Sequence, residues 1–153
     1  MNKFLKYALF GVIGGFLILQ AFRGDYPEIR MDNPKDIHQS VEISAEVSGI
    51  LKKACYDCHS METKYPWYAQ VAPISWRIIG HVEHGRGDLN FSEWSDLSKR
   101  KQLKVFDELI EEVEEGEMPL PSYVRYHSEA VLTEEEVRAL IIWAKESSTA
   151  LLY

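Results

Sequence analysis

The sequence predicts an all-α domain behind an N-terminal transmembrane helix. Three stretches carry apolar residues spaced three and four apart, which is the period of one face of an α-helix. No stretch of useful length alternates apolar and polar residues, so no β-strand is expected. The three apolar stripes are Val47, Ile50, Leu51 and Ala54; Leu103, Phe106, Leu109, Ile110 and Val113; and Val137, Leu140, Ile141 and Ala144.

An apolar run over residues 7–22, interrupted only by Gln20, predicts the membrane helix. As a helix it spans about 24 Å, short of the roughly 30 Å hydrocarbon core unless flanking residues extend it. Leu19-Gln20-Ala21 lacks the small-residue pattern of a cleavage site, which favours an uncleaved anchor over a signal peptide. Lys3 and Lys6 place the amino terminus in the cytoplasm and the domain on the exported side.

The expected division is an anchor or signal peptide over residues 1–23, a tether over 24–40 and a folded domain over 41–153. The middle segment contains Pro27, Asn33 and Pro34 without an apolar period, so it is either an extended tether or a loop packed on the domain. With 17 Lys and Arg against 24 Asp and Glu, the net charge of −7 argues against nucleic acid as a partner.

The first helix of the domain runs directly into Cys55-Tyr56-Asp57-Cys58-His59, which contains the only two cysteines of the chain. C-x-x-C-H is the pattern of covalent c-type haem attachment. Both thiols add to haem vinyl groups, and the imidazole ligates the iron. Because residues three apart share one helix face, the two sulfur atoms can reach neighbouring edges of one porphyrin.

Other interpretations use the same residues. A disulfide does not explain the histidine, and a thioredoxin-like dithiol requires a βαβ pattern that the sequence lacks. A zinc site remains open, with His81 and His84 completing a Cys₂His₂ set around a structural module.

Aromatic residues concentrate after the pentapeptide, and Pro73 suits the first turn of a helix that carries Ile74, Ile78, Ile79 and Val82 and stops at Gly85 or Gly87. Aromatic rings there either wall a porphyrin or form an ordinary core, and indole N–H groups or Arg77 are candidates to hold its propionates.

A long helix with an acidic outer face is expected before Gly116. Its run Glu111, Glu112, Glu114 and Glu115 is either a solvated face or a docking patch. In the following loop, Pro119 and Pro121 are expected to exclude regular helix, and Met118 is the candidate distal iron ligand or else core filler. His81, His84 and His127 are alternative distal ligands, whereas Met61 is too near His59 in sequence.

The last helix has a predicted capping box formed by Thr133 and Glu136, framed by a hydrophobic staple of Leu132 and Val137. It is expected to belong to the core and not to the site.

These features in this order resemble the cytochrome c fold and, more narrowly, the bacterial haem-binding-domain family of small c-type cytochrome-like proteins. The resemblance covers roughly residues 40 to 147, and it implies haem binding at Cys55, Cys58 and His59. The matching motifs are Cys55 to Ser60, Tyr65-Pro66-Trp67-Tyr68, Pro73-Ile74-Ser75-Trp76, His81, Gly85-Arg86, Leu89-Asn90-Phe91-Ser92 with Trp94, and Gly116-Glu117-Met118-Pro119.

The functional expectation is a single-pass inner-membrane protein that holds one covalent haem c in the periplasm and exchanges electrons with redox proteins. A haem-based gas or redox sensor is the alternative, alongside the zinc-stabilised module. Because no nucleophile–base pair, phosphate-binding loop or paired carboxylate motif stands out, an enzyme is not expected.

Overall fold

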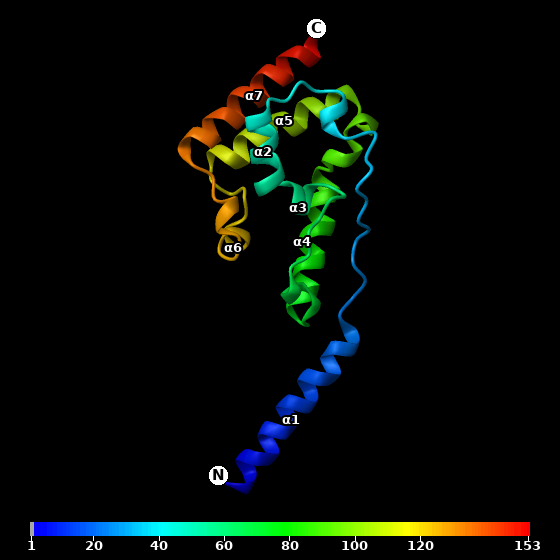
Figure 1. The fold of residues 1–153 in the computed structure, drawn as a ribbon, viewed down its shortest axis with the longest axis vertical. Coiled ribbons are helices and arrows are strands. Elements are labelled where there is room, and N and C mark those ends of the chain that lie inside the picture. Colours follow the sequence, from blue (N-terminus) through cyan, green and yellow to red (C-terminus); the bar gives the residue numbers. More distant parts are fainter. Residues whose placement is uncertain (1) are drawn as a thin grey trace.

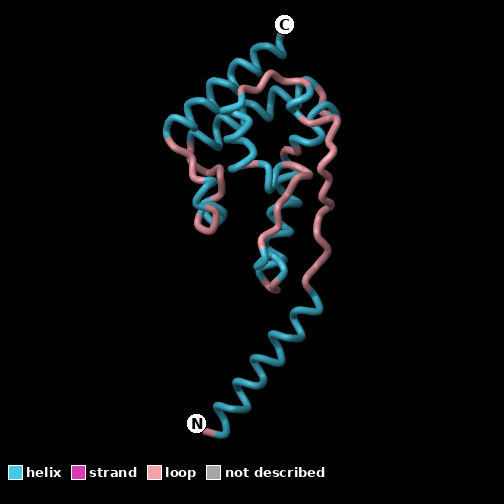
Figure 2. Tube along the Cα trace, in the orientation of Figure 1, coloured by secondary structure: helices cyan, strands magenta, loops and turns pink. Residues whose placement is uncertain are grey.

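A computed structural model describes residues 2–153, so that Met1 of the predicted anchor lies outside the described part. These residues form helices and loops without a β-strand, which confirms the all-α prediction (Figures 1 and 2). The α-helices are α1 (Lys3–Leu19), α2 (Ala45–Ala54), α3 (Tyr56–His59), α4 (Ile74–Asp88), α5 (Lys99–Glu114), α6 (Pro121–Val124) and α7 (Glu134–Leu152). Short 3₁₀ turns are η1 (Gln20–Phe22), η2 (Ile37–Gln39), η3 (Trp67–Gln70), η4 (Phe91–Asp96) and η5 (Ser128–Ala130).

Helix α1 projects away from the folded domain, as Figure 1 shows. Together with η1 it forms an apolar span of 20 residues, Lys3–Phe22, none of which is buried. At 1.5 Å per residue this is about 30 Å, which is enough to cross a hydrocarbon core. The helix therefore begins earlier than the apolar run and makes up the length that the run alone lacks.

The segment after α1 packs along the domain, which is the second of the two arrangements that the sequence left open. The Tyr26 hydroxyl donates to the Ala69 carbonyl at 2.6 Å, and the Arg30 amide donates to the Met61 carbonyl at 2.8 Å. Ile37 is fully buried in the core. In Figure 1 this segment runs from α1 up one side of the domain.

The core lies where α5 crosses α7 and α2 covers them. The ring centroid of Phe106 lies 5.0 Å from that of Trp94 and 5.6 Å from that of Trp143. Leu51 and Leu140 are fully buried in the same core. Thr133 and Glu136 make both hydrogen bonds of the capping box, as predicted. Trp143, absent from the predicted stripe, is buried and donates its indole N–H to the Glu42 carbonyl at 3.1 Å.

Two element boundaries differ from the expectation. Helix α4 continues through Gly85 and Gly87 to Asp88, because a glycine inside a helix weakens it without ending it. Pro121 begins α6, since the first helical position needs no intrahelical amide hydrogen bond. The expectation that both prolines exclude regular helix was therefore wrong for Pro121. Gly116 follows α5 with a φ of +73°, a conformation that favours glycine.

Candidate functional site

The pentapeptide forms a tight turn at the end of α2. Leu51 accepts a hydrogen bond from the Cys55 amide at 2.9 Å, so α2 extends up to the first cysteine. The Cys55 carbonyl in turn accepts from the amides of Cys58, at 3.2 Å, and His59, at 2.9 Å. The buried Ile50 and Leu51 fix α2 on the core, so the turn is presented from a rigid base.

The His59 imidazole is oriented by two backbone carbonyls. Its Nδ1 lies 2.9 Å from the Gly85 oxygen and 3.1 Å from the Leu89 oxygen. Carbonyl oxygens only accept, so Nδ1 carries the proton and Nε2 keeps a free lone pair. Burial lowers the pKa of His59, against the opposing effect of these two hydrogen bonds. A neutral imidazole with Nε2 free is the form that ligates a metal.

Helix α4 approaches the turn closely through Gly85. A β-carbon at position 85 would lie 2.8 Å from the Cys58 carbonyl oxygen and 3.2 Å from the Cys58 β-carbon. The same residue supplies one of the carbonyls that orient His59. The absence of a side chain at Gly85 therefore sets the distance between α4 and the pentapeptide.

A cavity of about 340 Å³ opens beside this turn. Cys55, His59 and Met118 all line it, so the structure brings three of the four predicted haem residues together. Its lining joins the end of α2 to one face of α5 and to the loop that carries Met118. The apolar part is formed by Ala54, Leu89, Phe91, Val105, Leu109, Val113, Pro119 and Leu132.

Charged side chains complete the lining. Lys101 and Lys104 come from the first half of α5, and Asp88, Glu108 and Glu112 are the acidic members. Lys104 pairs with Glu108 one turn along the same helix. Among the residues that line the cavity, the two lysines are the groups suited to bind carboxylates.

Both cysteines are free thiols in a poorly solvated environment. Burial, with a smaller effect of Cys58, raises the pKa of the Cys55 thiol to about 12. Burial and the neighbouring Asp57 raise the pKa of the Cys58 thiol to about 11, against an opposing effect of Arg86. Cys58 does not line the cavity itself, so its predicted role depends on its place one turn from Cys55.

Met118 is held by the end of α5. The amides of Glu117 and Met118 both donate to the Glu112 carbonyl, at 3.0 and 3.1 Å, which folds the loop back beside the helix. The methionine side chain is half-buried against the cavity. Its thioether and the His59 imidazole are thus two neutral donors that line one cavity, which suits haem iron.

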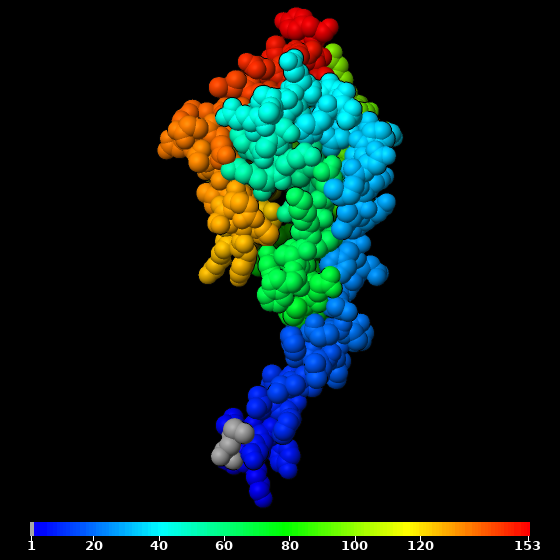
Figure 3. All heavy atoms as spheres, in the orientation of Figure 1, coloured from blue at the N-terminus to red at the C-terminus, as the bar shows by residue number. Residues whose placement is uncertain are grey.

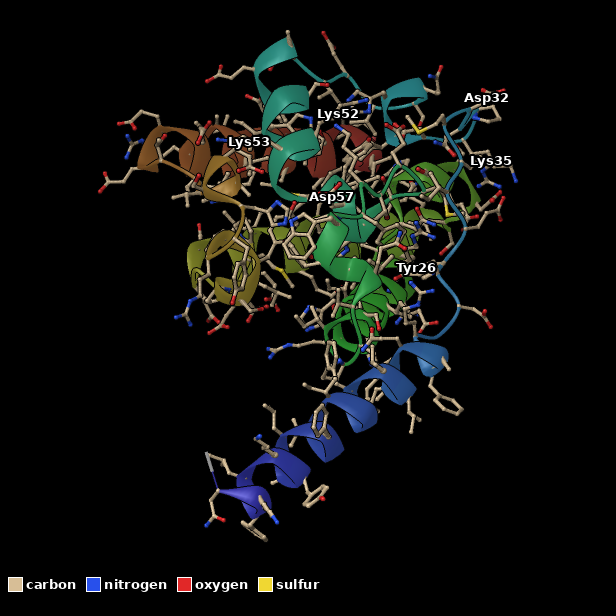
Figure 4. The ribbon with its side chains drawn as sticks, turned by 60° about the horizontal axis from the view of Figure 1, so that its bottom comes forward. Tyr26, Asp32, Lys35, Lys52, Lys53 and Asp57 are labelled. Carbon is tan, nitrogen blue, oxygen red and sulfur yellow. The ribbon has the colours of Figure 1, made fainter. Side chains whose placement is uncertain are left out.

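The chain beyond Met118 is attached to the pentapeptide through Asp57 on α3. The Tyr123 hydroxyl donates to Asp57 at 2.7 Å, and its ring stacks on His127 with centroids 4.2 Å apart. His127 also pairs with the Tyr68 hydroxyl at 2.8 Å. Figure 4 labels Asp57 on α3, in the middle of the domain.

The other candidate ligands lie outside the cavity lining. His84 turns back to the Gly80 carbonyl of its own helix, and His127 is engaged as described. His81 and the buried Met61 do not line the cavity either. Nor does Arg77, the candidate for the propionates, which is exposed at the start of α4.

The zinc interpretation finds no support in the geometry. Within residues 2–153, no three His, Cys, Asp or Glu side chains gather in a way that could hold a metal ion. The Cys₂His₂ set suggested by spacing is therefore not assembled.

Sequence reasoning missed several contributors to the cavity. Lys104 and Val105 follow Lys101 by three and four residues, so periodicity could have placed both lysines on one helix face with Val105. Phe91 belongs to the Leu89-Asn90-Phe91-Ser92 motif, but the sequence alone does not show that it lines the cavity. The orienting carbonyls of Gly85 and Leu89 had no sequence signal, because any residue supplies a carbonyl.

An oriented imidazole, a thioether and the Cys55 thiol around one cavity, with Cys58 one turn away, are the features of a helical haem-binding domain. The chain matches the model of the Haem-binding domain family over residues 14–146 and belongs to that family. The chain therefore binds haem, as the sequence predicted. No curated protein and no solved structure matches it.

Proposed function

We propose that the protein is a membrane-anchored c-type cytochrome with one haem, which transfers electrons on the exported side of the inner membrane. The observation that carries this proposal is that His59, Cys55 and Met118 line one cavity. When bound, the haem supplies one-electron exchange between ferrous and ferric iron.

Cys55 and Cys58 would form the two thioether bonds and thereby fix the haem at the end of α2. His59 would be the proximal ligand through Nε2, because Nδ1 is committed to the carbonyls of Gly85 and Leu89. Those two carbonyls hold the ring orientation and increase the basicity of the imidazole.

Met118 would be the distal ligand, and a thioether in that position raises the reduction potential relative to a second histidine. The apolar side chains that α5 contributes to the lining, Val105, Leu109 and Val113, would make the haem surroundings less polar, which also favours the less charged ferrous state. Lys101 and Lys104 would bind the haem carboxylates by charge-assisted hydrogen bonds.

The proposal contains no enzymatic step, since the residues assigned to the cavity hold a cofactor and position no substrate. The anchor is α1 with η1, a helix long and apolar enough to cross a membrane. Lys3 and Lys6 in its first turn favour a cytoplasmic amino terminus, which leaves the haem domain in the periplasm near respiratory redox proteins.

The test is the Met118→Ala variant of the holoprotein. We expect loss of the long-wavelength ferric sulfur-to-iron charge-transfer band, a lower potential in a reversible one-electron titration, and rapid binding of carbon monoxide. The reduced wild type should be six-coordinate and inert to carbon monoxide. Met31→Ala, at an exposed methionine on the packed segment, is the matched control and should change none of these properties.

An unchanged spectrum of Met118→Ala would reject methionine ligation. A wild-type protein that binds carbon monoxide rapidly would instead favour the gas-sensor function.

A further inference from the structure

The end of the domain nearest α1 exposes three large apolar side chains. Trp67 in η3 is 79% exposed, and Ile74 and Trp76 at the start of α4 are 47% and 44% exposed. We call these three residues the membrane-facing end. In Figure 3 the green lower end of the domain, which contains these elements, meets the blue end of α1.

Hydrogen bonds fix this end against the end of α1. The Gln20 side chain accepts from the Ala72 amide at 3.0 Å and donates to the Ala72 carbonyl at 3.2 Å. The Trp76 indole N–H donates to the Phe22 carbonyl. Tyr26, labelled in Figure 4 on the extended segment beside this end, adds its bond to Ala69. The domain is therefore fixed against the end of α1 and is not joined to it by a free linker.

The charge distribution separates this end from the rest of the chain. All 24 Asp and Glu residues lie outside residues 1–24 and 63–82, although the net charge is −7. The charged residues in those two segments are Arg23, Lys64 and Arg77 on the domain's side of the span, and Lys3 and Lys6 at the far end of α1. Carboxylates would be repelled by anionic headgroups, whereas Lys and Arg are attracted to them.

We infer that the membrane-facing end is embedded in the headgroup layer of the same bilayer that α1 spans. Tryptophan is enriched at that depth because its ring is apolar and its N–H is polar. The inference rests on the membrane anchoring in the proposed function and adds an orientation to it: the domain sits on the lipid surface in one pose.

This pose sets the height of the haem site. Helix α4 runs 15 residues from Ile74 to Asp88, next to Leu89 in the cavity lining. At 1.5 Å per residue α4 is about 22 Å long, so the cavity and the membrane-facing end lie at opposite ends of one rigid helix. Redox partners would meet the haem at that distance from the headgroups.

The experiment places a benzophenone amino acid at single positions of the full-length holoprotein in vesicles of phosphatidylethanolamine and phosphatidylglycerol. Positions 67 and 74 test the membrane-facing end. Position 142, where Ile142 is 57% exposed on α7, is the matched control, and position 9 on α1 reports anchoring itself. An unchanged haem spectrum shows that each variant is folded.

After illumination we expect lipid adducts at positions 9, 67 and 74, and no lipid adduct at position 142. Adducts at position 9 but not at 67 or 74 overturn the docked pose and leave the anchor intact. An absence of lipid adducts at position 9 overturns the anchoring and the pose together. Adducts at 67 and 74 to a second copy of the chain, in place of lipid, also overturn the inference.

Discussion

Gly85 lies so close to Cys58 that there is room for its α-hydrogen but not for a side chain. A β-carbon there would meet the Cys58 carbonyl oxygen at 2.8 Å, and that oxygen belongs to backbone that cannot rotate away. Helix α4 thus packs directly on the turn that carries Cys58 and His59. The same helix positions His59 through the Gly85 carbonyl, so packing and ligand orientation depend on one contact.

Replacing Gly85 by alanine should separate α4 from this turn. We expect Gly85→Ala to destabilise the domain by about 1–3 kcal/mol, as overpacking does, and to lower haem incorporation. Urea unfolding and the ratio of haem to protein measure the two effects. Gly80→Ala in the same helix is the control, because a β-carbon at that position meets nothing within 4 Å. Equal stability of the two variants would contradict the close-contact argument.

The hydrogen bond from Tyr123 to Asp57 should steady the loop that carries Met118. Tyr123→Phe removes a 2.7 Å bond to a carboxylate and keeps the ring that stacks on His127. We expect a loss of about 1.5–3 kcal/mol in unfolding free energy and a lower thermal midpoint for the sulfur-to-iron band. Tyr126→Phe, at a tyrosine that is 71% exposed, should leave both unchanged. If the sulfur-to-iron band of Tyr123→Phe were as heat-stable as that of the wild type, Tyr123 would not steady the loop that carries Met118.

A buried carboxylate beside the pentapeptide depends on Tyr56. Asp36 is 6% exposed, and the Tyr56 hydroxyl and the His38 ring contact it at 3.0 and 2.7 Å. Tyr56→Phe leaves this carboxylate with one partner fewer, so we expect a cost of about 1–3 kcal/mol in chemical unfolding. Tyr153→Phe, at a fully exposed residue, serves as the control. A Tyr56→Phe protein as stable as that control would show that His38 alone can satisfy the buried Asp36 carboxylate.

The cysteine thiols should react slowly in the folded apoprotein. Burial raises the pKa of Cys58 to about 11 and that of Cys55 to about 12, from an ordinary value of 9.0. The thiolate is the reactive form, so at pH 8 its fraction at Cys58 is about a hundredfold lower than in a free thiol. The greater nucleophilicity of a high-pKa thiolate compensates for about tenfold of this, which leaves alkylation about tenfold slower.

The sign of the pH dependence follows from the raised pKa. Between pH 9 and pH 10.5 the alkylation rate at Cys58 should rise about twentyfold, whereas that of a free thiol with a pKa of 9.0 should rise only about twofold. Mass spectrometry of the apoprotein treated with iodoacetamide at several pH values measures this. The urea-unfolded chain supplies the free-thiol control. A rate in the folded protein that levels off at about pH 10, as that of the control should, would contradict the burial of both sulfur atoms.

The sequence predicted the parts of the fold that depend on local pattern. The stripe ending at Ala54, the capping box at Thr133 and the helix stop at Gly116 are encoded by neighbouring residues, and they appear as expected. Val105 and Trp143 were missed because their burial is decided by the crossing of α5 and α7, which periodicity does not specify.

The candidate site was likewise predicted in part, where single residues have a recognisable chemistry. Cys55, His59 and Met118 could be selected because each has ligand chemistry, and the structure places all three around one cavity. His81 has the same chemistry but lies outside that lining, since the rotation of α4 about its axis decides which side chains face inward. Lys101 and Lys104 carry no motif. Periodicity puts them on one face of α5, but only the path of α5 along the cavity makes that face part of the site.

Covalent attachment of one haem through the pentapeptide is the central claim. The most direct measurement is the intact mass of the protein, expressed with cytochrome c maturation and denatured in acid acetone. The account predicts one species heavier than the polypeptide by a single haem, and loss of that added mass when Cys55 and Cys58 are both replaced by alanine. Wild-type protein recovered at the bare polypeptide mass, with its haem washed into the solvent, would contradict the account.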